Sequence, residues 1–179
     1  EPGPLGMRNE HLAVLAKSTE HCADLADILA GLALGEAHIE VVTFLRGCKL
    51  CPTMKPDGGI RPLALSNVLR RSSLKTLVRQ RAKDNAEAVG PSQYGVSRKN
   101  GIESLLKSLK ARLAACNSSV LVAIDFKAAF QNILRSSVRQ AVGKHAPWLK
   151  SACDAWYGGD ATHVLWDDAG VMHEVLAAC

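Results

Sequence analysis

A single acidic residue follows an apolar run in the sequence VLVAIDFKAAFQNILR, residues 120–135. The acid is Asp125, and the β-branched residues before it predict a buried strand over SVLVAID, 119–125, that ends at the carboxylate. A carboxylate beside the last carbonyl of a strand can bind Mg²⁺, because this ion needs only one or two protein carboxylates when waters and substrate phosphates complete its shell. An aspartate can also cap the following helix, and strand–Asp–helix order taken alone favours that structural role.

The residues after Asp125 favour a bound ligand. They are Phe126, Lys127, Ala128, Ala129 and Phe130. Small side chains let a ligand approach the backbone closely, and the ring of Phe130 offers a flat face beside them. The alternative for Phe130 is a core aromatic at helical spacing.

A second set of residues could hold phosphate. KPDGGIRPLAL carries Lys55 and Arg61 on either side of a strong turn signal, which predicts a β-hairpin over residues 49–66. Arginine can grip phosphate with two parallel hydrogen bonds and lysine acts as a point charge, so this hairpin could close over a triphosphate. Two solvated charges on a surface turn are the simpler alternative.

Basic residues concentrate in one part of the chain. Residues 55–112 hold 13 lysines and arginines against 4 aspartates and glutamates, whereas the rest of the 179 residues holds 9 against 13. This pattern favours a polyanion-binding face. A long helix over 67–89 carries many of these cations, with a solvated face as its alternative. The basic side chains of that helix are Arg70, Arg71, Lys75, Arg79 and Arg81.

The elements that must position these residues alternate along the chain. A helix is predicted over 9–17, and Asn9 could cap it. A second helix is predicted over 20–34, with glycines at its end. Residues 39–47 are either a strand or the tail of a helix. Beyond the hairpin and basic helix, we expect a loop at GPSQYGV, helices at 101–116, 127–142 and 147–157, and strands at 162–166 and 171–178 around the turn DDAG. This order predicts an α+β fold.

Four motifs, in order over residues 3–135, resemble those of reverse transcriptases. VAIDFKAAFQNI is similar to their first catalytic motif, D-x-x-x-A-F, and KPDGGIRPLALSNVLRR to their fingers hairpin. SQYGV resembles their Q-Y/F-G loop, and GPLGMRNEHL resembles the opening of non-LTR retrotransposon enzymes. WYGGDATHVLW and GVMHEV are similar to the stretch before the second palm motif. A group II intron-type enzyme is a related alternative origin.

The resemblance implies a role for each matching residue. Asp125 would bind two Mg²⁺ ions with help from the Phe126 carbonyl, and KAAF would form the floor of the nucleotide site, with Phe130 as the gate against a 2′-hydroxyl. Lys55 and Arg61 would neutralise the incoming triphosphate. Residues contacting the template would be Arg70, Arg71, Lys75 and Arg79 on the basic helix and Gln93, Tyr94 and Gly95 in the loop.

Two motifs of these polymerases do not occur in the sequence. The family has a second pocket motif and a Y/F-x-D-D pair, and nothing matching them occurs before Cys179. LWDDAG, 165–170, imitates the pair, but it follows Asp125 too closely and is better interpreted as a hairpin turn. The Cys48-x-x-Cys51 pair has no second pair at metal spacing, so zinc is disfavoured.

We therefore expect the fingers and first half of the palm of a right-hand polymerase. The fingers region would be 1–118, with the hairpin at 49–66, and 119–179 would be a partial palm with a small antiparallel sheet. The expected partners are an RNA template, a DNA primer, a deoxynucleoside triphosphate, and the palm and thumb of the same polyprotein, without which the fragment is inactive. The alternatives are a non-enzymatic nucleic-acid-binding remnant and an unrelated α+β domain.

The expected location is intracellular, with action in the nucleus for a non-LTR element. No apolar run reaches the ~18 residues typical of a membrane span, and EPGPLG lacks the basic start and apolar core of a signal peptide. The six irregularly spaced cysteines are interpreted as reduced thiols. The chain resembles a piece of a longer protein.

Overall fold

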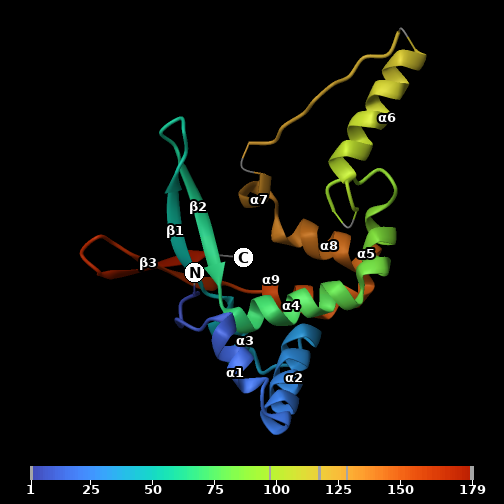
Figure 1. Ribbon diagram of the computed structural model, residues 1–179. Helices are drawn as coiled ribbons and strands as arrows, with labels where there is room; N and C mark the ends of the chain where they lie inside the picture. The colour runs from blue at the N-terminus through green and yellow to red at the C-terminus, as the bar shows by residue number, and fades with distance from the viewer. Residues whose placement is uncertain (1, 97, 117, 128, 178–179) are drawn as a thin grey trace. The chain divides into compact units, whose positions relative to one another are not determined.

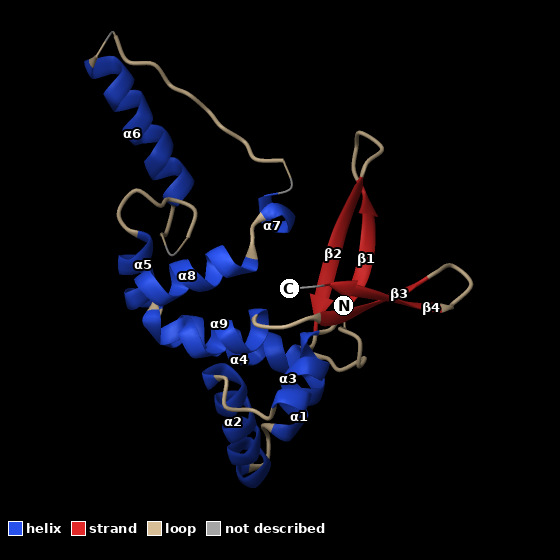
Figure 2. Ribbon diagram, turned by 180° about the vertical axis from the view of Figure 1, so that it is seen from behind, coloured by secondary structure: helices blue, strands red, loops and turns tan. Residues whose placement is uncertain are grey.

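Helices and a small sheet alternate in the computed structural model, which describes residues 2–96, 98–116, 118–127 and 129–177 (Figures 1 and 2). The α+β class is confirmed. The helices are α1 (Asn9–Leu15), α2 (Thr19–Leu34), α3 (Ile39–Arg46), α4 (Val68–Gln80), α5 (Ala82–Val89), α6 (Gly101–Ala115), α7 (Ala129–Asn132), α8 (Arg135–His145) and α9 (Lys150–Tyr157). The strands are β1 (Cys48–Met54), β2 (Ile60–Ser66), β3 (Ala161–Trp166) and β4 (Met172–Ala177).

The chain divides into two compact units. Unit 1 comprises Glu1–Arg79 and Trp148–Cys179, and unit 2 comprises Gln80–Pro147. These structural boundaries differ from the functional division at residues 118 and 119, which remains a prediction.

The sheet of unit 1 is mixed, with strand order β2-β1-β3-β4. β1 and β2 form the expected antiparallel hairpin, and β3 and β4 form a second one. The two hairpins join through a parallel pairing of β1 with β3, where Lys49 is opposite Val164. The small antiparallel sheet predicted within 119–179 is correct for the pairing of β3 with β4, but these strands belong to a mixed sheet, because β3 also pairs in parallel with β1.

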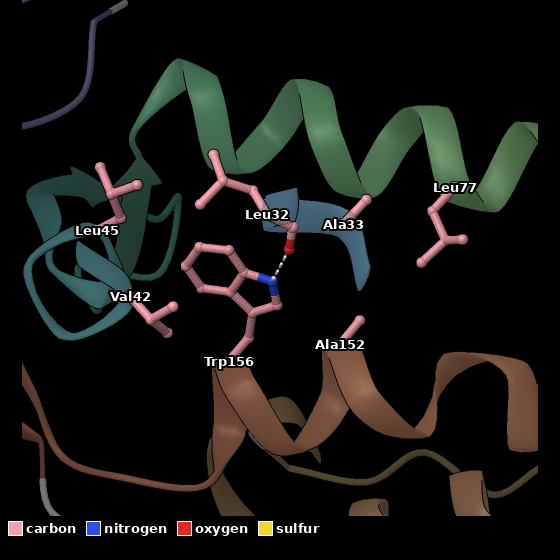
Figure 3. Close-up of a cluster of buried hydrophobic side chains, with 7 residues drawn as sticks. All are labelled: Leu32, Ala33, Val42, Leu45, Leu77, Ala152 and Trp156. Carbon is pink, nitrogen blue, oxygen red and sulfur yellow. Dashed lines mark hydrogen bonds between the residues drawn. The ribbon is translucent and has the colours of Figure 1, made fainter. Parts of the chain in front are cut away.

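A buried cluster between helices holds unit 1 together (Figure 3). It contains Leu32 and Ala33 of α2, Val42 and Leu45 of α3, Leu77 of α4, and Ala152 and Trp156 of α9. The Trp156 indole is 3% exposed, and its Nε1 donates a hydrogen bond to the Leu32 carbonyl at 3.3 Å. The single polar atom of this large ring is thus satisfied inside the core, as burial requires.

Helix ends in unit 1 follow local chemistry. The Ser18 hydroxyl accepts a bond from the His21 N–H at the start of α2. Gly35 ends the helix at φ 75°, a conformation that favours glycine. Asn9 does not cap α1, because it is already the first helical residue and Arg8 precedes the helix. Residues 39–46, for which strand and helix were both open, form a helix.

The predicted strand at 119–125 is wrong. These residues form no strand, and Val120, Val122 and Ile124 are 84%, 72% and 74% exposed. A strand requires a neighbour to pair its N–H and C=O groups, and the described sheet contains no residue of this segment. The apolar run is therefore extended but unpaired (Figure 2).

Two predicted long helices are interrupted. The basic helix breaks at Arg81, where φ is −103° and ψ is 26°, so that α4 and α5 are separate. The helix predicted over 127–142 divides into α7 and α8, because Leu134 takes an extended conformation with φ −69° and ψ 130°. Apolar spacing continues across both breaks, which explains why the sequence suggested single helices.

No single helix among the described residues is long and apolar enough to cross a membrane. The pair α2 and α3 meets the length and composition together, with a bend of 83° between them.

Candidate nucleic-acid and nucleotide site

The hairpin of β1 and β2 ends in a turn away from the helices of unit 1 (Figure 1). Two cations lie near this turn. Arg61 lies on β2 opposite Thr53, and Lys55 is the first residue beyond β1. Both side chains are exposed. The turn between them is ordered by hydrogen bonds from the Lys55 N–H to the Gly59 carbonyl at 2.7 Å and from the Gly58 N–H to the Lys55 carbonyl at 3.0 Å. The hairpin thus presents two positive charges on a defined backbone.

The four predicted template cations of α4 separate into two groups. Arg71, Lys75 and Arg79 are exposed and follow one another at four-residue spacing, which places them along one face of the helix. Arg70 is half-buried and points elsewhere. Its Nη1 donates to the Arg46 carbonyl at 3.1 Å, and its guanidinium lies 5.1 Å from the centre of the Trp156 ring. Arg70 is therefore engaged within unit 1 and is not available as the other three are.

Arg46 is a cation that the sequence did not distinguish. It is 6% exposed, and its Nε and Nη2 both donate to the Ala155 carbonyl, at 2.9 and 2.6 Å. Its own carbonyl accepts from Arg70. The two arginines link α3, α4 and α9 beneath the first residue of the hairpin, which fixes the base of the strand pair.

Arg71 shares a polar cleft with the N-terminal segment. The cleft has a volume of about 390 Å³ and is lined by Pro2, Arg8, Asn9, Glu10 and Arg71. Two motifs that lie far apart in the sequence, the opening segment and the start of the basic helix, are thus brought together within unit 1. Arg8 is a second cation beside Arg71, and nothing in its sequence spacing indicated this.

The predicted template loop of unit 2 is held by its own side chains. The Gln93 Oε1 accepts from the Gly95 N–H at 2.7 Å. Arg98 donates from Nη1 to the Pro91 carbonyl at 3.1 Å, and its guanidinium lies 4.2 Å from the centre of the Tyr94 ring. Sequence reasoning missed Arg98, because residues of an irregular loop have no periodicity that predicts their contacts.

The first residue of α6 also constrains this loop. Gly101 is buried, and a Cβ built on it would overlap the Tyr94 carbonyl oxygen. Because that oxygen belongs to the backbone, only the absence of a side chain lets the loop pass this close. Gly101 is therefore a positioning residue for Tyr94.

Asp125 lies in the extended segment of unit 2 with its side chain exposed. Within the described part of the chain, no hydrogen bond or ion pair engages its carboxylate, and α7 begins only at Ala129, so Asp125 is not a helix cap. Phe126 and Phe130 are 73% and 94% exposed, which makes the core-aromatic alternative for Phe130 wrong in this structure.

The rest of the KAAF segment is only partly ordered by contacts. The carbonyl of Lys127 accepts a bond from the Asn132 Nδ2 at 3.0 Å, and Ala129 opens the four-residue helix α7. The prediction for Ala128 lies outside the described residues. The described residues contain no group of three or more histidines, cysteines, aspartates or glutamates able to hold a metal ion. The Mg²⁺ site predicted at Asp125 and the Phe126 carbonyl stays a prediction.

The LWDDAG sequence is a hairpin turn, as predicted. The Asp167 carboxylate accepts from the N–H groups of Ala169 and Val171, at 3.0 and 2.8 Å, and from His173 Nε2 at 2.9 Å. These bonds, with that of His173 the largest contribution, lower the pKa of Asp167 from its usual value. Both oxygens of this acid thus hold the β3–β4 turn.

Comparison with protein-family models gives no match to this chain, and comparisons with curated proteins and with solved structures give none either.

Proposed function

We propose that this chain forms part of an RNA-directed DNA polymerase similar to the reverse transcriptases of non-LTR retrotransposons. It would supply the fingers and the first part of the palm. The observation that carries the proposal is the K-P-D-G-G-I-R-P hairpin: a segment that resembles the fingers motif folds as two strands with Lys55 and Arg61 exposed near its free end. The order of the four sequence motifs supports the same function.

Under this proposal, the hairpin binds the triphosphate of the incoming nucleotide. Lys55 and Arg61 neutralise charge on its phosphates, and this favours transfer because charge develops there in the transition state. The exposed face of Arg71, Lys75 and Arg79 contacts template phosphates, joined by Arg8 through the shared cleft. Arg70 is left out of the proposed template contacts, because its guanidinium donates to the Arg46 carbonyl and lies against the Trp156 ring within unit 1.

Asp125 and the Phe126 carbonyl would hold Mg²⁺ when substrate is present. The bound ions supply stabilisation of negative charge on the attacking and leaving oxygens. Asp125 needs further carboxylates for this work, and the proposal places them in a Y/F-x-D-D pair outside the 179 residues. Phe130, 94% exposed in α7, would stack under the sugar and reject a 2′-hydroxyl.

Nucleotide binding by the 179-residue chain tests the hairpin. We expect isothermal titration with a deoxynucleoside triphosphate and Mg²⁺ to show binding that the double variant Lys55→Ala/Arg61→Ala weakens by about a hundredfold or more, since two charge-assisted bonds are lost and each contributes ~1.5–3 kcal/mol. Lys17→Ala, which removes an exposed cation elsewhere in unit 1, is the matched control and should leave affinity unchanged. Equal affinity in the double variant and the control would refute the proposed role.

Template binding tests the α4 face separately. The triple variant Arg71→Ala/Lys75→Ala/Arg79→Ala should weaken RNA binding and reduce the slope of log affinity against log salt by about 0.7 per lost phosphate contact on a single strand. Fluorescence anisotropy at several salt concentrations measures both quantities. An unchanged slope would remove α4 from the template path.

A second candidate function is a non-enzymatic nucleic-acid-binding module derived from such an element. The basic bias of residues 55–112 favours binding under either function. The coding sequence after Cys179 discriminates them: an intact pocket motif with Y/F-x-D-D supports the polymerase, whereas a stop codon supports the module. Templated primer extension by the 179 residues alone, abolished by Asp125→Asn, would contradict the expectation that further acids are required.

A further inference from the structure

A cleft in unit 2 lies between the end of α5 and the loop that follows it. Its volume is about 540 Å³, within the range of small-ligand sites. The residues that matter for its chemistry are Lys83, Glu87, Val89, Gln93, Val96 and Arg98. Lys83 and Glu87 come from α5, and the loop that joins α5 to α6 turns back beside them (Figure 1).

The apolar side chains that line this cleft remain exposed to solvent. Val89 and Val96 are 44% and 52% exposed, although both contribute to its wall. Covering them with a flat apolar surface would remove that area from water, which is favourable. A nucleobase has such a surface on both faces, and it can enter a cleft of this volume.

The polar groups of the cleft match the remainder of a nucleotide. Lys83 and Arg98 supply positive charge, which suits a phosphate, and in the described structure no ion pair engages Lys83. Glu87 accepts hydrogen bonds only, so it repels phosphate and suits the N–H groups on the edge of a base. The side-chain oxygen of Gln93 is occupied by the Gly95 N–H, which leaves the amide NH₂ as a donor.

The loop wall of this cleft is formed before any ligand arrives. Arg98 fixes the loop through the Pro91 carbonyl and the Tyr94 ring. Gly101 allows α6 to approach the Tyr94 carbonyl. A preformed wall loses little conformational freedom on binding, which favours affinity.

We propose that this cleft binds one unpaired nucleotide of a single-stranded nucleic acid, with its base against Val89 and Val96 and its phosphate beside Lys83. The inference rests on the proposed function, since the strand would be the template approaching the Gln93–Gly95 loop. The cleft is a separate contact site on the α5 side of that loop. It would bind a nucleotide through its base, and that base need not be paired with another strand.

Two probes with the same phosphates separate base binding from charge. One is a short single-stranded oligoribonucleotide, and the other is an abasic strand of equal length. We expect the 179-residue chain to prefer the base-containing strand by about fivefold, the size of one modest apolar contact. Val96→Ser should abolish that preference. Lys83→Ala should lower the affinity for both strands by the same factor. Fluorescence anisotropy measures each affinity.

Matched controls in unit 2 complete the experiment. Leu113→Ser removes an apolar side chain that is 39% exposed on α6, and Lys110→Ala removes an exposed cation there; neither residue lines the cleft, so both variants should behave as the unsubstituted chain. Circular dichroism checks that each variant is folded. A base preference that persists in Val96→Ser, or is absent from the unsubstituted chain, overturns the inference.

The same experiment keeps the two proposals apart. If the unsubstituted chain shows no base preference but still binds triphosphate through Lys55 and Arg61, the cleft inference alone is overturned. Absence of any RNA binding overturns the cleft together with the template role of α4. Adenosine monophosphate binding as tightly as the oligoribonucleotide would assign the cleft to a free nucleotide and overturn its assignment to a strand.

Discussion

The two compact units use their apolar residues in opposite ways. In unit 1, Val42 and Trp156 are 2% and 3% exposed, because α2, α3, α4 and α9 face one another across a common cluster (Figure 3). In unit 2, Val122 is 72% exposed, and Gly101 and Ala146 are the only described residues that are buried. The comparison teaches that apolar composition alone does not make a core: apolar faces must meet other apolar faces.

This difference extends to the residues proposed to act. Lys55 and Arg61 stand on a paired hairpin whose base is fixed by Arg46 and Arg70. Asp125 and Phe130 stand on or beside a segment without strand partners. The two cations proposed to bind triphosphate thus lie on an ordered hairpin of unit 1, whereas Asp125 and Phe130 lie in a part of unit 2 with few described contacts. Sites on rigid elements hold their geometry better than sites on loops.

The same substitution in the two units gives the largest contrast. Val42→Asp places a charge in the core and should lower the free energy of unfolding by about 4 kcal/mol or more. Val122→Asp changes an exposed side chain and should alter that free energy by less than about 0.5 kcal/mol. Urea denaturation followed by tryptophan fluorescence and circular dichroism measures both. A large loss in Val122→Asp would mean that the 119–125 segment is packed in solution.

Gly101→Ala tests whether the close contact of α6 with the Tyr94 carbonyl contributes to the stability of unit 2. The new Cβ would overlap the Tyr94 carbonyl, so the loop must shift, and we expect a cost of ~1–3 kcal/mol. Gly31→Ala is the control: it lies inside α2, where an added Cβ would meet open space, and it should stabilise by ~0.5–1 kcal/mol. Denaturation curves compare them, and equal stability in the two variants would contradict the contact.

Much of the fold could be predicted because its signals are local. The PDGG turn, the glycine that ends α2 and the amphipathic spacing of α6 each act within a few residues, and each element formed where expected. The strand at 119–125 failed for a physical reason: its apolar composition is typical of a buried strand, but a strand exists only with a partner, and composition does not say whether one is present.

The candidate site was predictable only in part. Spacing alone could have separated Arg70 from the other α4 cations, because Arg71, Lys75 and Arg79 share a four-residue interval that Arg70 breaks. Arg98 and Gly101 could not have been found in this way. Their contacts with Tyr94 depend on the path of an irregular loop, which no periodicity encodes.

Acid should weaken one local feature of unit 1. The pKa of Asp167 lies below its usual 3.8, chiefly because of the bond with His173. A lowered folded-state pKa means that the charged carboxylate favours folding at pH values above 3.8, and that this contribution disappears as pH falls through the lowered pKa. Asp167→Asn should therefore lower Tm near neutral pH but not in strong acid. A Tm difference that stays constant down to strong acid would show that charge is not the cause.

The smallest expected effect is a difference in thiol reactivity between one cysteine of unit 1 and one cysteine of unit 2. Burial raises the pKa of the Cys48 thiol in unit 1, partly opposed by Arg70, whereas hydrogen bonds from Ser118 and Ser119 lower the pKa of the exposed Cys116 thiol in unit 2 to about 7. Because the thiolate is the reactive form, iodoacetamide should label Cys116 about tenfold faster than an unperturbed thiol at neutral pH, and Cys48 far more slowly.

Mass spectrometry of labelled peptides over a range of pH gives the rate at each cysteine. The midpoint for Cys116 should lie near 7 and should rise in Ser118→Ala/Ser119→Ala, which removes both hydroxyls. A midpoint that does not move would mean that the hydroxyls do not hold the thiolate. Fast labelling of Cys48 in the folded chain would mean that the base of the hairpin opens, and the rigidity assigned to unit 1 would then be wrong at the point that supports Lys55 and Arg61.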